Sequence, residues 1–468
     1  MNIIFLKVNI ALFGNPSIFA VDYESIDMKQ LIFIFTVAWG AVAGSRAQEV
    51  LTLDDCLRWG IENNLSLRGQ RNEIQKSKYA ISENRAKLLP QINGVANFND
   101  NFDPPVSVTD GSAYDKPYNV TQTLQYNAAA GLQLQMPLYN QTVYTALSIS
   151  KVLDEISRLS YEKAREDLMM QIAKMYYLGQ ATAEQITLVK ANIARLEELR
   201  DITVAFYDNG MAMEVDVKRV NINLENLQVQ YDNAQVMLAQ QLNMLKYVMD
   251  YPAEKDITLE PVNAETIAPI ELTGLSENLY ELQLLQSKSD LAERQKKMIS
   301  HEYIPSLTLT GNWMYTAYTD KLHHWFHSGP SNHWYRSYGL GLALRVPIFD
   351  GLDKRYKIRK AKIDLENIRL AQENTRKNLE TQYINATNDL MNNQRNFKKQ
   401  KDNYLLAEDV YEVTSDRYRE GIASMTEVLQ DEMRMSEAQN NYISAHYNYR
   451  VTHLSLLKLT GRVESLLK

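Results

Sequence analysis

Apolar residues recur at three- and four-residue steps over six long stretches, with Lys, Glu, Gln and Asn between them. This spacing puts the apolar side chains on one stripe of a helix, so it predicts amphipathic helices. The predicted helices cover residues 53–89, 140–206, 212–250, 277–303, 351–417 and 424–459. A helix of about 68 residues is about 100 Å long. Because no compact globule holds such helices, we expect coiled-coil-like hairpins or a tube.

Two stretches instead alternate strictly between apolar and polar or small residues, LQYNAAAGLQLQMPL (124–138) and GLGLALRVPI (339–348). Weaker candidates follow Pro90 and Pro305. Strict alternation predicts strands with one apolar and one polar face. In an exported protein this pattern is typical of a barrel with lipid outside and water inside, although a half-buried soluble sheet explains it equally well. Aromatic residues near the far strand ends would suit a membrane girdle: Trp313, Tyr315, Trp334, Tyr335 and Tyr338.

The two halves of the chain repeat each other. LLPQINGVANF (88–98) matches YIPSLTLTGNW (303–313), GLQLQMPLYN (131–140) matches GLALRVPIFD (341–350), and YDNG (207–210) matches YREG (418–421). The offsets of 215, 210 and 211 residues are nearly constant, which indicates an internal duplication. Each half reads as helix, strand, loop, strand, long helix, glycine turn and helix. Asn140 and Asp350 are the predicted N-caps where strand passes into helix.

These patterns divide the chain into repeats and connections. The first repeat is predicted at 48–250, a linker with three prolines at 251–276, the second repeat at 277–461 and a short tail at 462–468. Residues 99–121 and 319–333 are rich in Pro, Gly, Asp, Ser and His, so we expect loops there.

The beginning of the chain has the order of a secretory signal. Lys29 precedes the apolar run LIFIFTVA (31–38), and small residues lead to Ala47. We predict a signal peptide within residues 1–47, with Met28 as the true start, and a longer, unusual signal is the alternative. After Ala47 no uninterrupted apolar run reaches the ~18–20 residues of a membrane-spanning helix, so an exported protein without a helical anchor is expected.

Charge and chemistry exclude several classes of function. The net charge of −7 argues against a nucleic-acid partner. The lone Cys56 is predicted to be a buried helix residue. The sequence contains no phosphate-binding glycine loop, nucleophile elbow or HExxH motif, so neither an enzyme nor a cofactor is predicted. The four histidines of HHWFHSGPSNH (323–333) are loosely spaced without interleaved carboxylates or thiols, which favours an external loop over a metal site.

The ordered set of motifs resembles the TolC family of outer-membrane efflux proteins over about residues 50–461. The resemblance is carried by the duplicated junctions MPLYN and VPIFD, the opening helix LTLDDCLRWGIENN with RAKLLPQI, and the paired glycine turns. It implies a mainly α fold with a membrane β-barrel portion. Family members are trimers whose protomers each give four strands to one outer-membrane barrel, and their helices continue it as a periplasmic tube with a closing tip.

The resemblance also implies roles for the glycine turns. Gly210 and Gly421 would turn the two helical hairpins at the periplasmic tip, where family members meet the adaptor of an inner-membrane pump. The small apolar tips would form the docking surface, with local packing as the alternative: Met211, Ala212, Met213, Ile422, Ala423 and Met425.

Further residues would act at the pore constriction. Aligned on Gly421, Glu427 takes the family's first acidic position, and Gln430 departs from the second, next to Asp431. Three copies of Glu427 would form a negative ring, whereas a solvated helix face is the alternative.

The resemblance also bears on three further positions at the tips. Tyr418 would join the contacts that close the tip or would simply pack. Asp216 aligns with an acidic position, but Lys218 and Arg219 favour an ordinary salt bridge. Ala423 replaces a frequent basic residue, which puts the usual charged latch in doubt.

The resemblance therefore implies a passive exit duct of a tripartite efflux or type I secretion system. Its expected partners are two further copies of the chain, a periplasmic adaptor, an inner-membrane pump and outer-membrane lipid. The alternative is an exported structural coiled coil without channel activity. An adaptor is a third possibility, but adaptors carry one hairpin flanked by compact β domains, and this chain has two hairpins.

Overall fold

The computed structural model describes residues 49–110, 117–122, 124–262, 274–323 and 334–467. The predicted signal region and histidines 324, 327 and 333 lie outside these ranges. The helices are α2 Leu53–Asn63, α3 Leu65–Ala86, α4 Gln141–Asp208, α5 Glu214–Met249, α6 Tyr280–His301, α7 Asp353–Arg419 and α8 Met425–Leu459. The strands are β1 Glu49–Leu51, β2 Gln91–Asp100, β3 Val106–Asp110, β4 Tyr118–Gln122, β5 Tyr126–Tyr139, β6 Ile257–Leu259, β7 Ser306–Thr319 and β8 Trp334–Arg345.

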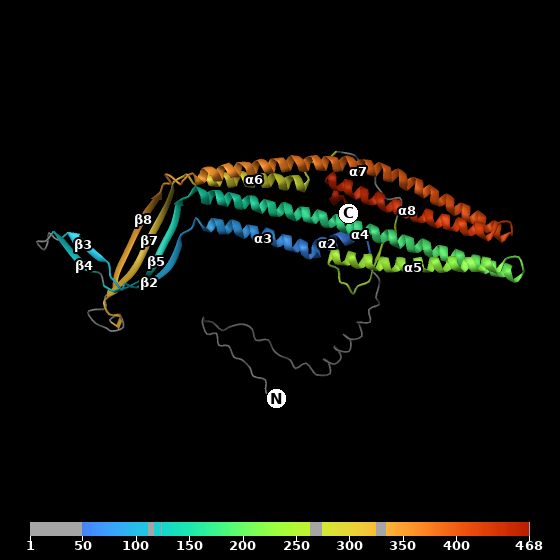
Figure 1. Cartoon of the computed structure of the whole chain (residues 1–468), viewed down its shortest axis with the longest axis horizontal. Helices are drawn as coiled ribbons and strands as arrows, with labels where there is room; N and C mark the ends of the chain where they lie inside the picture. The colour runs from blue at the N-terminus through green and yellow to red at the C-terminus, as the bar shows by residue number, and fades with distance from the viewer. Residues whose placement is uncertain (1–48, 111–116, 123, 263–273, 324–333, 468) are drawn as a thin grey trace, which may run out of the picture. The chain divides into compact units, whose positions relative to one another are not determined.

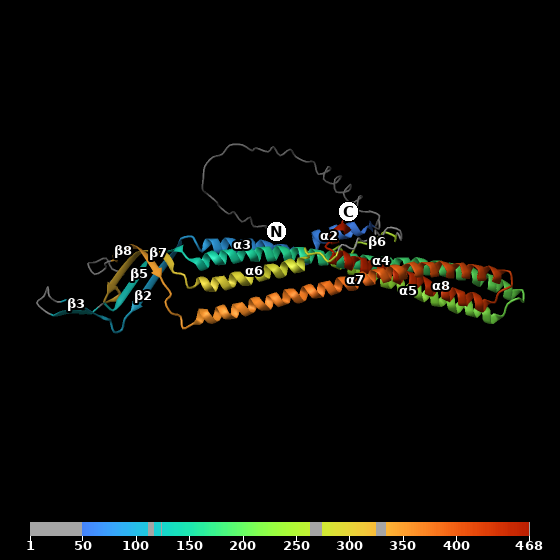
Figure 2. The same cartoon turned by 90° about the horizontal axis from the view of Figure 1, so that it is seen from above.

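Two long helical hairpins confirm the predicted helical architecture. Helix α4 has 68 residues and pairs with α5, and α7 has 67 residues and pairs with α8. Both hairpin turns lie at the same end of the helices, and the four-stranded sheet lies at the other end (Figures 1 and 2). The predicted helix 53–89 is broken at Asn64. The Asn64 side chain caps α3 by accepting from Leu67 N–H at 2.9 Å and donates to the Val248 carbonyl at 2.8 Å.

The larger sheet confirms the predicted strands with one apolar and one polar face. Its order is β2-β5-β7-β8 and all pairs are antiparallel. Directly opposed residues of antiparallel strands share a face of the sheet. One face carries apolar residues across the strands, including Ile92, Leu134, Leu309, Leu340 and Leu342. The other carries amides and hydroxyls, including Asn93, Gln133, Gln135, Thr308, Thr310 and Asn312.

The predicted aromatic residues divide between the two faces. The register puts Trp313, Tyr315, Trp334 and Tyr338 on the apolar face, toward the strand ends farther from the helices. Tyr335 lies on the polar face, opposite Thr316. Four of the five residues therefore occupy the face on which a membrane girdle is expected.

The structure corrects two predictions about the connections and adds a short strand to a third. The predicted loop 99–121 contains the antiparallel pair β3–β4, because the alternating Val106 and Val108 outweigh their Pro- and Asp-rich flanks. The predicted linker contains β6, which pairs with β1. The second predicted strand begins earlier and ends at Arg345, so Val346 and Ile348 lie outside it.

The strand-to-helix junctions differ between the repeats. Asn140 is the N-cap of α4, as predicted, and its side chain accepts from Thr142 N–H at 3.1 Å. Asp350 is not the N-cap of α7, because Gly351 and Leu352 adopt positive φ and α7 begins at Asp353. The Asp350 carboxylate still accepts from the Lys354 N–H at 3.1 Å.

The main core lies where α2 packs against α4 and α5. It includes Leu57, Ile172, Tyr176 and Met249. Cys56 is fully buried there and forms no disulfide, and burial raises the pKa of its thiol to about 12, which makes it unreactive. In the described part of the chain, no helix is both long and apolar enough to cross a membrane.

Candidate functional site

The two hairpin tips have the same backbone geometry. Gly210 has φ +75° and Gly421 has φ +74°. Each glycine N–H donates to the tyrosine carbonyl three residues earlier, at 2.9 Å in both tips. The next two N–H groups converge on one carbonyl, that of Phe206 in the first tip and Arg417 in the second. The glycines therefore end α4 and α7 in the left-handed conformation that glycine tolerates best.

Substitution of a tip glycine should destabilise the protein only through the strained backbone conformation, and not through a steric clash. A Cβ added at Gly421 would meet no atom within 4 Å, so Gly421→Ala is expected to destabilise the tip by about 1 kcal/mol through its positive φ. Gly69, inside α3, is equally open but lacks a positive φ, so Gly69→Ala should stabilise the protein by up to about 1 kcal/mol. Denaturant unfolding of both variants tests the pair, and equal effects would contradict the assigned turn.

The apolar side chains at the tips differ in exposure. Met211 is 68% exposed and Ile422 is 62% exposed. Ala212 and Ala423 are half-buried. Ala423 packs against the apolar cluster between the hairpins, which consists of Leu196, Leu199, Val220, Leu227, Tyr411, Tyr418, Met425, Val428, Leu429 and Met435. Met213 is 66% exposed. Met425 is 3% exposed and packs within this cluster, so the prediction that it belongs to the tip surface is wrong. Two methionines and one isoleucine thus form the apolar surface that a partner could cover.

Glu427 lies in the first turn of α8 and forms a capping box with Ser424. Its carboxylate accepts from the Ser424 N–H at 2.8 Å and the Ser424 hydroxyl at 3.1 Å. These bonds, the backbone one first, hold the pKa of the Glu427 carboxyl below its usual value, so it is ionised at neutral pH. Gln430 is exposed one turn further along.

Asp431 is turned toward its own hairpin. Its side chain is 12% exposed, accepts from the Thr414 hydroxyl of α7 at 2.9 Å and pairs with Arg434 at 3.0 Å.

Asp216 is the counterpart of Glu427 in the first tip. It accepts from the Met213 N–H at 3.4 Å and forms the predicted type of salt bridge with Arg219, at 3.1 Å.

Tyr418 packs between the two hairpins of one chain. It is 6% exposed, its hydroxyl donates to Thr203 of α4 at 3.3 Å, and its ring lies 5.6 Å from that of Phe206. Arg419 extends the link by pairing with Glu198 at 2.7 Å. These contacts hold the second tip against α4.

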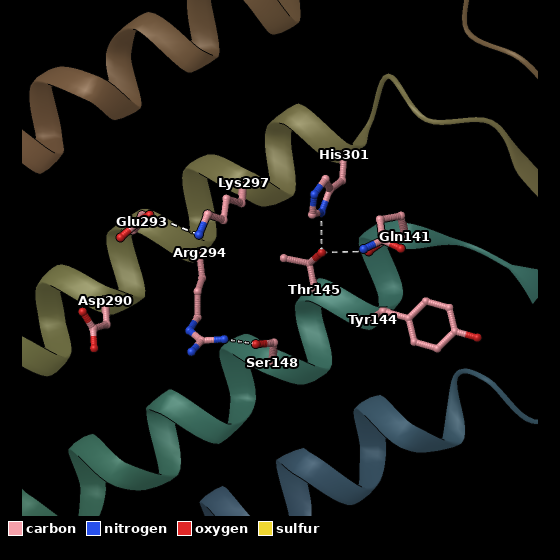
Figure 3. A pocket seen from close by; sticks show the side chains of 9 residues that line it. All are labelled: Gln141, Tyr144, Thr145, Ser148, Asp290, Glu293, Arg294, Lys297 and His301. Atoms are coloured by element: carbon pink, nitrogen blue, oxygen red, sulfur yellow. Dashed lines mark hydrogen bonds and ion pairs between the residues drawn. The ribbon is translucent and has the colours of Figure 1, made fainter.

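A cavity of about 410 Å³ lies at the opposite end of the helices, between the start of α4 and the end of α6 (Figure 3). Thr145 donates to the Gln141 carbonyl at 2.8 Å, which leaves its oxygen to accept from Nδ1 of His301 at 2.7 Å. Arg294 donates to Ser148, and Lys297 pairs with Glu293 within α6. The Thr145–His301 and Arg294–Ser148 hydrogen bonds join α4 to α6 at the end of the helices that is nearer the sheet. Within the described ranges no cluster of three or more metal-ligating side chains occurs.

Sequence reasoning missed a row of exposed apolar residues on α5. Val215, Ile222, Val229 and Val236 recur every seven residues, on the side away from the buried Val220 and Leu227. Helix α7 carries a similar row: Tyr356, Ile363, Leu370, Ile384, Met391 and Leu405, spaced by seven or fourteen residues. The heptad spacing was the signal available in the sequence, because two apolar rows on one helix indicate two packing surfaces.

Comparison with known proteins identifies this architecture. A family model described as outer membrane efflux protein matches residues 60–249 and 275–462. The outer membrane protein TolC of Vibrio cholerae is 22% identical over 456 residues, which cover 93% of this chain and 96% of that protein. The probable efflux pump outer membrane protein TtgC of Pseudomonas putida is 22% identical, over 87% of this chain and 82% of that protein.

A solved structure agrees in fold. The outer membrane channel CmeC of Campylobacter jejuni has a TM-score of 0.70 and 18% identity, and covers 96% of this chain and 94% of its own. The matching family consists of channels and not of enzymes, and the match extends over both repeats, which favours the duct over a structural coiled coil or an adaptor. The chain belongs to the outer membrane efflux protein family, and it serves as an exit duct in the outer membrane that extends into the periplasm.

Proposed function

We propose that three copies of the chain close one barrel and one helical tube, and that the tips dock on the periplasmic adaptor of an inner-membrane pump. The observation that carries the proposal is the four-stranded sheet with one apolar face. Among the described strands, β2 pairs only with β5 and β8 only with β7, so both edges of this sheet are open. Open edges do not persist in lipid, because their backbone groups would lack partners. Neighbouring copies remove them, and three copies would give a barrel of twelve strands.

The exposed rows on α5 and α7 support the same assembly. The α5 row lies opposite the face that packs on α4, and its Ile222, Val229 and Val236 are each more than half exposed. Apolar side chains repeating every seven residues form the seam of a coiled coil. A second copy of the chain is the partner we propose for both rows.

The tip would then form the narrow end of the duct. We assign the acidic ring to Glu427, because its carboxylate is exposed, fixed by Ser424 and ionised, with Gln430 as its neutral neighbour. Asp431, Asp216 and Tyr418 form contacts within one chain. Their proposed role is therefore to hold the shape of the tip around the ring.

Site-specific photo-crosslinking in cells tests both interfaces. A photoreactive residue at Ile222 should yield covalent dimers and trimers of the chain. The same residue at Ile422 or Met211 should capture a periplasmic adaptor, identified by mass spectrometry. Gln228 provides the matched control, since it is exposed on α5 but lies off the apolar row. Chain-to-chain products from Gln228 and none from Ile222 would contradict the helical interface, and a tip without adaptor products would contradict docking.

A further inference from the structure

The polar face of the four-stranded sheet carries one charged side chain. The β7–β8 register puts Arg345 on this face, directly opposite Ser306. Across β2, β5, β7 and β8, the other residues of that face are uncharged amides, hydroxyls, glycines, apolar residues or tyrosines. The face thus offers neutral hydrogen-bonding groups along its length and a cation at one level.

That cation lies at the helix-proximal end of the sheet. Arg345 is the last residue of β8 and is exposed, and it has no ion-pair partner in the ranges that the structure describes. Arg336, the other arginine of β8, lies on the opposite face, where its guanidinium is 5.8 Å from the ring centroid of Tyr338. The two arginines share a strand but point to opposite sides of the sheet.

We propose that Arg345 gives the duct a preference for anionic solutes where the barrel meets the helical tube. This inference rests on the proposed trimeric barrel, in which the polar face lines the water-filled interior. Three guanidinium groups would then lie at one level and stay charged at every physiological pH. Rings of arginine favour anions in pores, and guanidinium binds carboxylate, sulfonate and phosphate groups in a bidentate manner. The solutes favoured are therefore those that carry such groups.

Ionic strength controls how far this preference reaches. The Debye length is about 8 Å at physiological salt and about 30 Å at 0.01 M. A ring on the wall of a wide lumen therefore acts most strongly at low salt. Its sign is opposite to that of the proposed Glu427 ring at the other end of the duct, so the two rings would select at different levels.

Reversal potentials of the full-length protein in planar bilayers test the selectivity. In a KCl gradient at low salt, Arg345→Glu should lower the chloride-to-potassium permeability ratio about sevenfold, because a change of one kT in local potential energy shifts the two ions about 2.7-fold each in opposite directions. Arg345→Gln should give a smaller change in the same direction, and both changes should shrink at 1 M salt. Arg336→Gln removes the same charge from the other face and should leave the ratio unchanged. Conducting Arg345 variants with the wild-type ratio would overturn the inference and leave the duct intact.

Thiol labelling in cells tests the orientation separately. Cys56 is the only native cysteine and is fully buried, so the background is low. A membrane-impermeant sulfonated thiol reagent should label Arg345→Cys and should not label Leu344→Cys, whose side chain faces the proposed lipid side. The reverse pattern would overturn the assignment of Arg345 to the lumen. Failure of the wild-type protein to form trimers would instead contradict the proposed assembly.

Discussion

Replacing Gly131 with alanine is expected to prevent assembly of the duct. Gly131 lies in the middle of β5, opposite Met314 of β7, at the centre of the sheet. A Cβ there would lie 2.8 Å from the Met314 Cα and still closer to the Trp313 carbonyl oxygen. Both are backbone atoms of the neighbouring strand, so no side-chain rotation relieves the contact. The two strands would have to separate, at a cost of ~3 kcal/mol or more.

Gly94 provides a matched control in the same sheet. It lies on β2, opposite Leu132, and a Cβ there would meet no atom within 4 Å. The measurement is the amount of trimer on a semi-native gel of the unheated outer-membrane fraction. Gly94→Ala should keep the wild-type amount, and Gly131→Ala should lose most of it. A full yield of trimer from Gly131→Ala would show that the β5–β7 contact is not as close as described.

The second large effect is a loss of stability as pH rises, caused by Glu432. This residue is 4% exposed on α8, within the apolar cluster between the hairpins, and its Oε1 has no hydrogen-bond partner among the residues that the structure describes. Val428 and Met435 flank it along the helix. Burial raises the pKa of the Glu432 carboxyl from 4.5 to about 7, because the apolar surroundings disfavour its charged form.

Few charged groups oppose or assist this ionisation. From α7, Tyr411 interacts electrostatically with Glu432, and Arg195 and Arg419 act on Tyr411 in turn. Arg195 of α4 is engaged by Glu408 at 2.7 Å. Helix α5 contributes the apolar Val220 and Leu227 to the cluster. Ionised Glu432 would thus remain a buried and uncompensated charge.

The sign of the effect follows from proton binding. The folded protein holds the Glu432 proton more tightly than the unfolded chain, so its contribution is complete below about pH 4.5 and is lost as pH rises through about 7. The shift corresponds to about 3 kcal/mol of unfolding free energy. Glu432→Gln cannot ionise, so we expect it to remove this part of the pH dependence.

Denaturant unfolding at pH 5 and pH 8 measures the difference. Glu427→Gln serves as the control, because Glu427 is exposed and its pKa is lowered, so this variant should retain the wild-type loss between the two pH values. An identical pH dependence in the wild type and in Glu432→Gln would rule out Glu432 as its source.

The sequence alone determined the elements that depend on local periodicity. A repeat of 3.6 residues identified the long helices and a repeat of two identified the strands, because both periods are written into neighbouring residues. The duplicated YDNG and YREG motifs located both turns, since a positive φ there favours glycine. The resemblance alone, and not the periodicity, predicts roles for these tip residues: Glu427, Gln430, Asp431, Tyr418 and Asp216.

Packing between distant segments sets the contacts of those residues. One step along a helix rotates a side chain by about 100°, so Gln430 is exposed, Asp431 faces α7 and Glu432 is buried, although the three are consecutive. The pairing of β5 with β7 made Gly131 indispensable, and the pairing of β7 with β8 set Arg345 apart from Arg336. Such differences depend on residues more than a hundred positions away or on the partner strand, and periodicity along the chain does not contain them.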